Sequence, residues 1–266
     1  MSPQEPVIRI RGLRNQFGSQ VVHENLDLDV YRGDIIGVVG GSGSGKSVLL
    51  RSIIGLGRPA AGSISLFGEE VSTLSDSRRA AIDQRCGVLF QNGALFSSLT
   101  VAENVAVALT EHHDLDPELV IRLAKLKIAL AGLPLDAADK YPSQLSGGMV
   151  KRAALARSLA LDPDILFLDE PTAGLDPIGA AAFDQLILTL RDSLGLTVFL
   201  VTHDLDTLYT ICNRVAVLAE KRILVADSLD VVEKNSNEWI QEYFKGPRGR
   251  SAQRASTNYA NQHSGH

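Results

Sequence analysis

The chain of 266 residues carries 26 Lys and Arg residues against 31 Asp and Glu residues, a formal net charge of -5. This mild acidity argues against a nucleic-acid-binding protein, which would show an excess of basic residues. The longest stretch without a formal charge, residues 86–102, contains polar side chains and is shorter than the roughly 18 apolar residues that a membrane span needs. We therefore expect that this chain does not cross a bilayer.

The first third of the chain predicts mainly β structure. Residues 7–11 and 22–30 alternate between apolar and polar side chains, as half-buried strands do. The apolar run 35–39 ends in glycines and predicts a strand buried on both faces. Apolar residues at helical spacing over 48–56 predict a helix that the segment from Gly55 to Pro59 stops. Further strands are predicted at 64–67 and 87–90.

The rest of the chain alternates between helices and strands. Residues 100–160 are helical in pattern without an intervening strand, which predicts a helical subdomain inserted into a core. Strands follow at 165–169 and 198–201, with a helix from Pro177 between them and short β segments near Val215 and Ile223. This order predicts an α/β fold with a mainly parallel sheet, preceded by an antiparallel β region. We expect this domain to span residues 1–244.

The last residues, 245–266, differ in composition from the domain. They contain no acidic residue and few apolar ones. A flexible, solvated terminus accounts for this composition. We therefore expect a flexible tail, and the alternative is a docking arm for a partner subunit.

A glycine-rich loop follows the strand 35–39 and precedes the helix. It fits the phosphate-loop pattern G-x-x-x-x-G-K-[ST] at every fixed place. Glycines let consecutive backbone N–H groups turn toward a polyphosphate, and the helix start adds its positive dipole end. The lysine can bridge the outer phosphates and the final serine can ligate Mg²⁺. The sequence therefore predicts an ATP site formed by Gly40, Gly41, Ser42, Gly43, Ser44, Gly45, Lys46 and Ser47, whereas a glycine turn without a ligand is the plainer alternative.

Two later strands end in residues that suit phosphate chemistry. Asp169 and Glu170 close the apolar strand 165–168. Beside a phosphate loop, Asp169 is expected to face Mg²⁺, and Glu170 can polarise the attacking water as a general base. His203 follows the strand 198–201 and is expected to donate a hydrogen bond to the terminal phosphate, although a histidine in this place is also common in ordinary turns. We predict catalytic roles for Glu170, His203 and Lys46.

A second helix start has the features of an anion site. Ser146, Gly147 and Gly148 immediately precede the predicted helix that begins near 148. One chain has one phosphate loop, so this second helix start has no phosphate of its own to bind unless another copy supplies it. The sequence therefore predicts a two-fold pair of chains that share two ATP molecules. A serine-capped turn without a ligand is the alternative.

These motifs, in this order over residues 7–244, resemble the nucleotide-binding subunit of an ABC transporter. The resemblance implies a Walker A loop at 40–47, a signature at 145–149 and a Walker B strand at 165–170. It further implies that Phe17 stacks on adenine, that Gln91 and Asp176 contact nucleotide, and that Mg²⁺ is held by Ser47, Gln91 and Asp169.

The sequence around the motifs resembles that of the ATPase of Mla/Mce-type phospholipid systems. The segments 90–96, 145–149 and 151–157 carry this likeness, including Met149 where most of the wider family has Gln, whereas the D-loop at 173–176 follows the general pattern. The likeness implies a second copy of the chain, an integral membrane permease, a periplasmic lipid-binding ring protein and a small STAS-domain partner. It also implies a peripheral position on the cytoplasmic face of the inner membrane and a role in outer-membrane lipid asymmetry.

Three other functions are compatible with parts of the sequence. One is the ATPase of an importer for a small polar nutrient, which the motifs do not separate from a lipid transporter. A second is an ABC ATPase that works without a permease. Such proteins usually have tandem cassettes or a long insertion between Gln91 and the signature, and this chain has neither. The third is an ATP-sensing scaffold, which should lack one of the hydrolytic residues.

Overall fold

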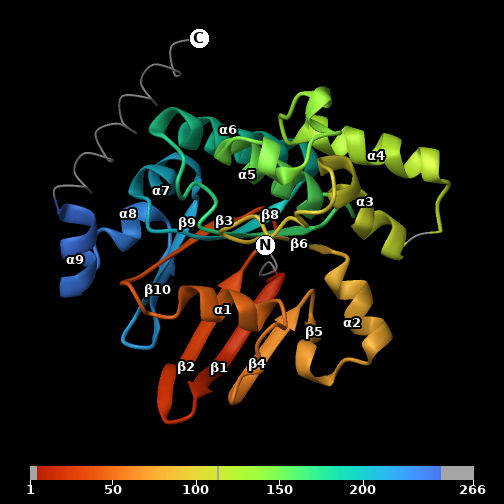
Figure 1. Cartoon of the computed structure of the whole chain (residues 1–266). Helices are drawn as coiled ribbons and strands as arrows, with labels where there is room; N and C mark the ends of the chain where they lie inside the picture. The colour runs from red at the N-terminus through yellow and green to blue at the C-terminus, as the bar shows by residue number, and fades with distance from the viewer. Residues whose placement is uncertain (1–4, 113, 247–266) are drawn as a thin grey trace. The chain divides into compact units, whose positions relative to one another are not determined.

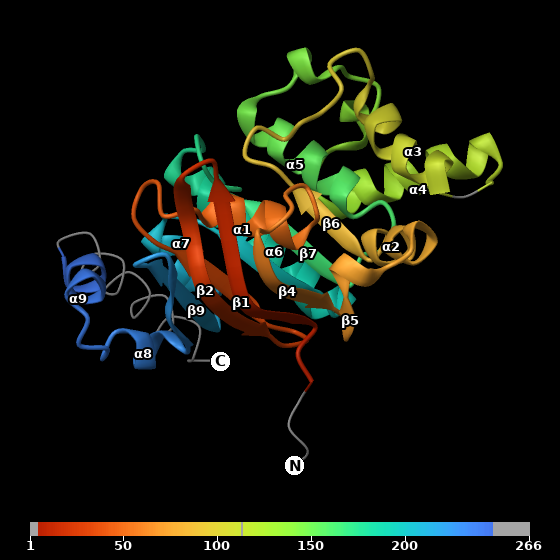
Figure 2. The ribbon, with the colours of Figure 1, turned by 90° about the horizontal axis from the view of Figure 1, so that it is seen from below.

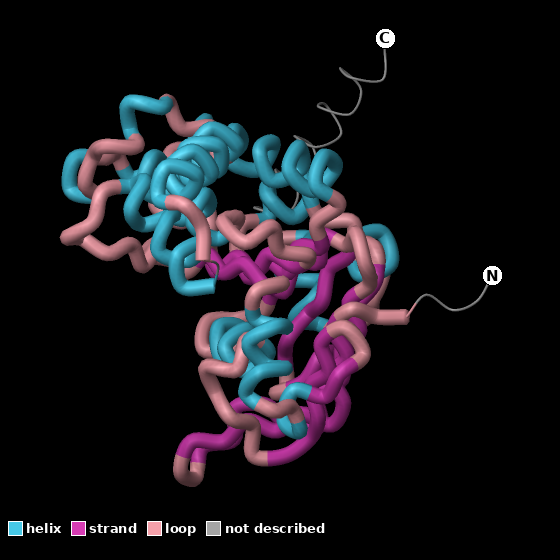
Figure 3. Tube along the Cα trace, turned by 90° about the vertical axis from the view of Figure 1, so that its right-hand side faces the viewer, coloured by secondary structure: helices cyan, strands magenta, loops and turns pink. Residues whose placement is uncertain are grey.

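The computed structural model describes residues 5–112 and 114–246. The chain forms two compact units, one made of Met1–Leu74 and Phe199–His266 and the other of Ser75–Val198. Both contain helices and strands, coloured cyan and magenta in Figure 3. Within the described ranges, no helix is both long and apolar enough to cross a membrane. The α/β fold class predicted from the sequence is confirmed.

The first unit begins with an antiparallel sheet, as predicted. Its strand order is β2-β1-β4-β5. Ile8 in β1 pairs with Val30 of β2 on one side and with Leu66 of β4 on the other, and all three side chains are buried. Phe17 ends β1 and Gln20 begins β2, so the turn between them is tight. The strands are β1 (Ile8–Phe17), β2 (Gln20–Val30), β4 (Ala61–Leu66) and β5 (Glu69–Glu70).

This unit has a second group of strands, two of which form a parallel pair. Strand β3 (Ile35–Val39) lies between β9 (Arg214–Ala219) and β8 (Thr197–Val201), and β10 (Arg222–Asp227) lies outside β9. The β3–β9 pair is parallel, whereas β10 runs antiparallel to β9. All five residues of β3 are buried, as expected of a strand covered on both faces.

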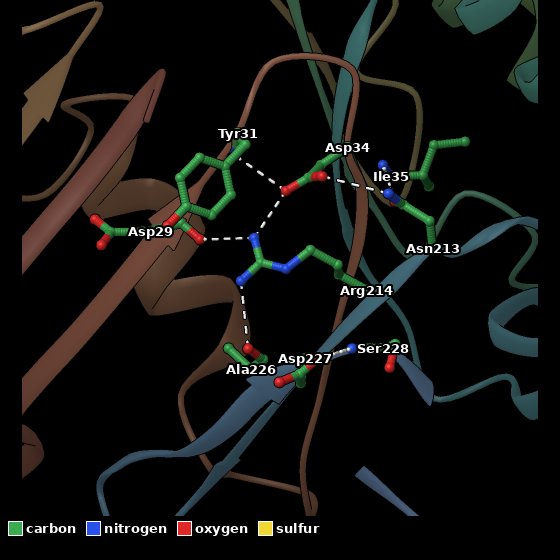
Figure 4. Close-up of polar contacts among 9 residues, drawn as sticks. All are labelled: Asp29, Tyr31, Asp34, Ile35, Asn213, Arg214, Ala226, Asp227 and Ser228. Carbon is green, nitrogen blue, oxygen red and sulfur yellow. Dashed lines mark hydrogen bonds and ion pairs between the residues drawn. The ribbon is translucent and has the colours of Figure 1, made fainter. Parts of the chain in front are cut away.

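Charged side chains fix the point at which β3 begins (Figure 4). The Arg214 guanidinium donates to the Asp34 carboxylate at 2.8 Å and to the Asp29 carbonyl at 3.0 Å. The Asn213 side chain accepts from the Ile35 N–H at 2.7 Å and donates to Asp34 at 3.3 Å. The Arg214 guanidinium also lies 5.0 Å from the centre of the Tyr31 ring. These contacts fix the strand that leads into the phosphate loop.

The helices of the first unit are short. They are α1 (Lys46–Ile53), α7 (Leu205–Ile211), α8 (Leu229–Val232) and α9 (Glu238–Lys245), with one 3-10 turn at Val71–Thr73. Helix α1 lies beside the antiparallel sheet (Figure 1), and Asn15 of β1 donates to the Ser52 hydroxyl of α1 at 2.9 Å. The predicted stop at 55–59 is confirmed, whereas Leu56, which we counted in the helical spacing, lies beyond the end of α1. Gly55 adopts a left-handed φ of 77° after Ile53, and Leu56 is 66% exposed.

The second unit consists mainly of helices. They are α2 (Asp76–Asp83), α3 (Val101–His112), α4 (Pro117–Leu130), α5 (Gly147–Ser158) and α6 (Pro177–Leu194), with 3-10 turns at Leu135–Ala137 and Pro142–Gln144. Helices α3, α4 and α5 pack against one another (Figure 2). Strand β6 (Cys86–Leu89), in which buried and half-buried residues alternate, and the fully buried strand β7 (Ile165–Asp169) form a parallel pair.

The predicted helical stretch is confirmed, because the described residues between 100 and 160 contain no strand. Its status as an inserted subdomain and the domain limit at residue 244 stay predictions. Of the predicted tail, 245–266, residues 247–266 lie outside the described part of the chain.

Candidate nucleotide site

The phosphate loop connects β3 to α1 through glycines that no other residue could replace without strain. Gly43 and Gly45 adopt left-handed φ angles of 76° and 99°. Gly40 approaches the neighbouring backbone so closely that an added Cβ would lie 2.2 Å from the Leu218 carbonyl oxygen. The loop backbone therefore takes a course that only glycine permits at these positions.

The loop offers positive groups to an anion. Helix α1 begins after Gly45 with no side chain capping its first turn, so its N–H groups can serve a ligand. The Lys46 Nζ donates to the carbonyls of Gly40 and Gly41 at 2.8 and 3.2 Å, which places the ammonium within the loop. The buried Ser44 hydroxyl has no hydrogen-bond partner among the described residues. This arrangement fits the triphosphate of a nucleotide.

The His23 ring packs against the phosphate loop at Gly45. The sequence pattern did not indicate this contact. The ring is fully buried in β2, and its Nδ1 lies 3.0 Å from the Asn15 amide nitrogen, which makes Nδ1 the acceptor. A Cβ added to Gly45 would lie 2.5 Å from the His23 Nε2. Burial lowers the pKa of His23 to about 4, so the ring is neutral at physiological pH.

The inward orientation of His23 comes from an irregularity in the strand pair. We predicted that His23 lies on the face opposite to Leu26 and Leu28, but all three side chains are buried. The β1–β2 register shifts on either side of Asn15, and Asn25 adopts a φ of 50°. This bulge changes which face each side chain points to, and a strict two-residue alternation cannot anticipate it.

The acidic pair lies at the end of β7. All five residues of β7 are buried, and Asp169, its last residue, is 6% exposed. Glu170 follows with a left-handed φ of 48°, which is unusual for a residue with a side chain. Asp176 accepts a hydrogen bond from the Gly179 N–H at 2.9 Å and so caps α6. The capping role of Asp176 was not predicted.

The serine and glycines of the signature form an open helix start. Ser146 caps α5 by accepting from the Met149 N–H at 3.3 Å, and both Ser146 and Gly147 are exposed. Gly147 lines a hollow together with Gln91 and Gly174. Three predicted motifs, the Q-loop (the segment that begins at Gln91), the signature and the D-loop, therefore meet within the second unit.

The aromatic residue and the histidine predicted to contact ATP both lie in the first unit. Phe17 is 62% exposed, which makes its ring accessible for stacking, and it borders a hollow beside Arg51 and Ser52 of α1. His203 is exposed after β8, and its carbonyl accepts from the Tyr243 hydroxyl of α9 at 3.3 Å.

The predicted site residues thus fall into two groups. The first unit contains Phe17, residues 40–47 and His203, and the second contains Gln91, residues 146–148, Asp169, Glu170 and Asp176. Ser47, Gln91 and Asp169 supply hydroxyl, amide and carboxylate oxygens, which are the hard donors that Mg²⁺ prefers. The individual roles of these residues stay predictions.

The sequence has many known relatives. It is 38% identical over 240 residues to the intermembrane phospholipid transport system ATP-binding protein MlaF of Escherichia coli K12, which covers 90% of this chain and 89% of that protein. It is 35% identical to MlaF of Haemophilus influenzae, covering 90% of each. It is also 36% identical to a probable ribonucleotide transport ATP-binding protein of Mycobacterium leprae, covering 92% of this chain and 71% of that protein.

Solved structures and a family model agree with this relationship. The ATP-binding cassette MJ0796, a dimer in a post-hydrolysis state with ADP and Pi, superposes with a TM-score of 0.77 at 29% identity, covering 84% of this chain and 98% of that one. The cbiO1 protein of Clostridium perfringens gives 0.78 at 25% identity, covering 95% and 99%. Residues 23–173 match the family model described as ABC transporter. The chain therefore belongs to the ABC transporter family and is an ATPase of that family.

Proposed function

We propose that this chain powers a phospholipid transporter by hydrolysing ATP. The observation that carries the proposal is its 35–38% identity, over about nine tenths of both chains, to the MlaF proteins of two bacteria. Their names describe the ATP-binding protein of an intermembrane phospholipid transport system. The phosphate loop and the acidic end of β7 support the ATPase half of the proposal on chemical grounds.

We assign the chemical roles by the donors that each residue presents. Lys46 and the N–H groups of residues 40–47 bind the phosphates, and Ser47, Gln91 and Asp169 hold Mg²⁺, which offsets phosphate charge when bound. Glu170 accepts the proton of the attacking water, and His203 donates to the terminal phosphate. Phe17 stacks on adenine. Ser146, Gly147, Gly148 and Asp176 complete the site of a second copy.

The partners follow from the same proposal. Two copies of the chain enclose two ATP molecules and drive an integral membrane permease from the cytoplasmic face of the inner membrane. A periplasmic lipid-binding ring protein and a small STAS-domain protein belong to the proposed assembly, which maintains outer-membrane lipid asymmetry. No nucleic acid takes part.

The hydrolytic role of Glu170 is tested by Glu170→Gln. The variant keeps the shape of the side chain and loses the base, so we expect ATP binding to persist while hydrolysis falls by about 100-fold or more. In the presence of ATP, the dimer of the variant chain should then accumulate. Size-exclusion chromatography with light scattering detects this dimer. Wild-type turnover by Glu170→Gln would remove Glu170 as the base.

A second candidate cargo comes from the mycobacterial relative, which is 36% identical over 246 residues and is named for ribonucleotide transport. That name agrees with the alternative of a small polar solute. The ATPase does not contact the cargo in either scheme, so its own site residues suit both. The identity of the permease that the ATPase drives decides between the two cargoes.

Affinity purification of the complete complex from its native membrane separates the two cargoes. We expect a permease that co-purifies with a lipid-binding ring protein and with bound phospholipid, identified by mass spectrometry. Reconstituted into phosphatidylglycerol and phosphatidylethanolamine vesicles, the complex should move labelled phospholipid in an ATP-dependent manner. A permease associated with a solute-binding protein, and ATP-driven transport of ribonucleotides, would overturn the phospholipid assignment.

A further inference from the structure

Lys151 occupies an unusual place in the second unit. It lies on α5, one turn after the signature glycines, and only 7% of the residue is exposed. Its Nζ donates to the backbone carbonyl of Gln91 and, at 3.2 Å, to the backbone carbonyl of Glu170. One buried ammonium therefore joins the Q-loop to the residue that we propose as the general base.

A buried ammonium costs stability unless hydrogen bonds and charges compensate it. Burial lowers the pKa of Lys151, and the nearby carboxylates of Glu170 and Asp169 oppose that shift. The Lys151 ammonium nevertheless donates its hydrogen bonds to main-chain carbonyls and not to those carboxylates. Lys151 therefore fixes the backbone from which the Glu170 side chain projects.

The backbone at Glu170 adopts a strained conformation that surrounding contacts must stabilise. Its left-handed φ of 48° costs about 1 to 2 kcal/mol for a residue with a Cβ, so this conformation persists only where surrounding contacts hold it. The bond from Lys151 to the Glu170 carbonyl is one of these contacts. Without it, the Glu170 carbonyl keeps the hydrogen bond from the Ala173 N–H at 3.2 Å, but the peptide after Glu170 loses one of its two described anchors, and we expect the carboxylate to shift with it.

The Q-loop is attached to α5 at a second place as well. Arg157 donates to the carbonyls of Gly93 and Ala94 at 3.0 and 2.7 Å. Gly93 has a φ of 74°, and an added Cβ would lie 3.3 Å from Ala154 and 3.4 Å from Val150 on the same helix. The Q-loop is thus held along α5, but of these two cations only Lys151 also reaches Glu170.

We infer that Lys151 is a positioning residue that holds the Q-loop and the general base in a fixed relation to the signature helix. Helix α5 begins at the signature, so a displacement of its first turn is transmitted through Lys151 to the Gln91 and Glu170 backbones. The inference rests on the proposed role of Glu170. It extends that role by naming the group that aligns the base.

The test compares full-length variants in steady-state ATP hydrolysis. Lys151→Met removes the donors at similar length, and we expect kcat to fall by about 10- to 100-fold, because a base misplaced by about 1 Å loses rate on this scale. KM and the Kd of a fluorescent ATP analogue should change by less than about threefold, since Lys151 is not proposed to contact nucleotide. Lys151→Arg, which keeps the charge and the donors, should recover part of kcat.

Two further variants separate this role from a general effect on folding. Lys140 is in the same unit and forms an exposed pair with Asp136 at 2.7 Å, so Lys140→Met should leave kcat unchanged. In the Glu170→Gln background, Lys151→Met should lower the residual rate by less than about twofold, because the base that it aligns is already absent. If Lys151→Met does not fold, Lys151→Gln replaces it throughout.

The inference is overturned if the Lys151 variant keeps wild-type kcat, or if it lowers kcat as strongly in the Glu170→Gln background as in the wild type. It is also overturned if the loss appears in Kd with kcat unchanged. An active Glu170→Gln variant would instead overturn the proposed base itself. The two failures are therefore distinguishable in one set of assays.

Discussion

At the scale of single residues, His23 couples the phosphate loop to pH. Its folded pKa of about 4 lies below the usual value of 6.5, so the unfolded chain binds more protons between these values. We therefore expect the free energy of unfolding to decrease as pH falls from 6.5 toward 4, by up to about 3 kcal/mol from this group. Urea unfolding at several pH values measures the change.

The matched variant for this measurement is His23→Gln, which retains an amide for hydrogen bonding and does not titrate. Other groups titrate in the same range, so the informative quantity is the difference between the two pH profiles. We expect the wild type to lose more stability than the variant between pH 6.5 and 4. Parallel profiles would contradict a buried, neutral His23.

The residues proposed to contact ATP or Mg²⁺ were easier to predict than the residues that support them in the fold. Lys46, Asp169 and Glu170 follow from local patterns, because a glycine loop or a buried strand places them in sequence order. His23 and Lys151 act through tertiary contacts to Gly45 and to two carbonyls. No spacing along the chain encodes these contacts, so the sequence identified neither residue as part of the site.

At the scale of secondary-structure elements, long or fully buried segments were predicted, whereas the short helices α2, α7, α8 and α9 were missed. The strands β3 and β7 are buried at every position, and their apolar runs are unambiguous. Helix α2 buries only Ile82, so it presents almost no apolar stripe. The sequence of α9 did contain a signal, since Asn237 precedes apolar residues at helical spacing, Ile240 and Phe244.

Helix α9 provides a test of this capping signal. The Asn237 side chain accepts from the N–H groups of Trp239 and Ile240 at 3.0 and 3.4 Å. Asn237→Ala leaves both donors unsatisfied, and we expect the free energy of unfolding to fall by about 1 kcal/mol. Asn237→Ser can cap the helix as well and should stay within a few tenths of a kcal/mol of the wild type. Equal destabilisation by both variants in urea titrations would count against capping as the cause.

At the scale of the whole molecule, the predicted pair of chains requires each ATP to meet the phosphate loop of one copy and the signature of the other. The start of α5 supports this arrangement, because Ser146 and Gly147 are exposed there, and the first-turn N–H groups that the Ser146 side chain does not cap can bind an anion. Two inactive variants should then complement each other. Lys46→Ala disables the loop and keeps the signature, whereas Ser146→Arg keeps the loop and blocks the signature.

A dimer formed from one copy of each variant contains one intact site and one doubly disabled site. Random mixing makes about half of the dimers mixed, so activity should rise above that of either variant, to at most about a quarter of the wild-type value. Each variant alone should stay inactive, because its dimers contain no site that has both an intact loop and an intact signature. A mixture of Lys46→Ala with Lys46→Ala/Ser146→Arg should also stay inactive, because neither chain has an intact loop. If each chain instead used its own loop and signature, mixing would restore nothing, and the shared site would have to be abandoned.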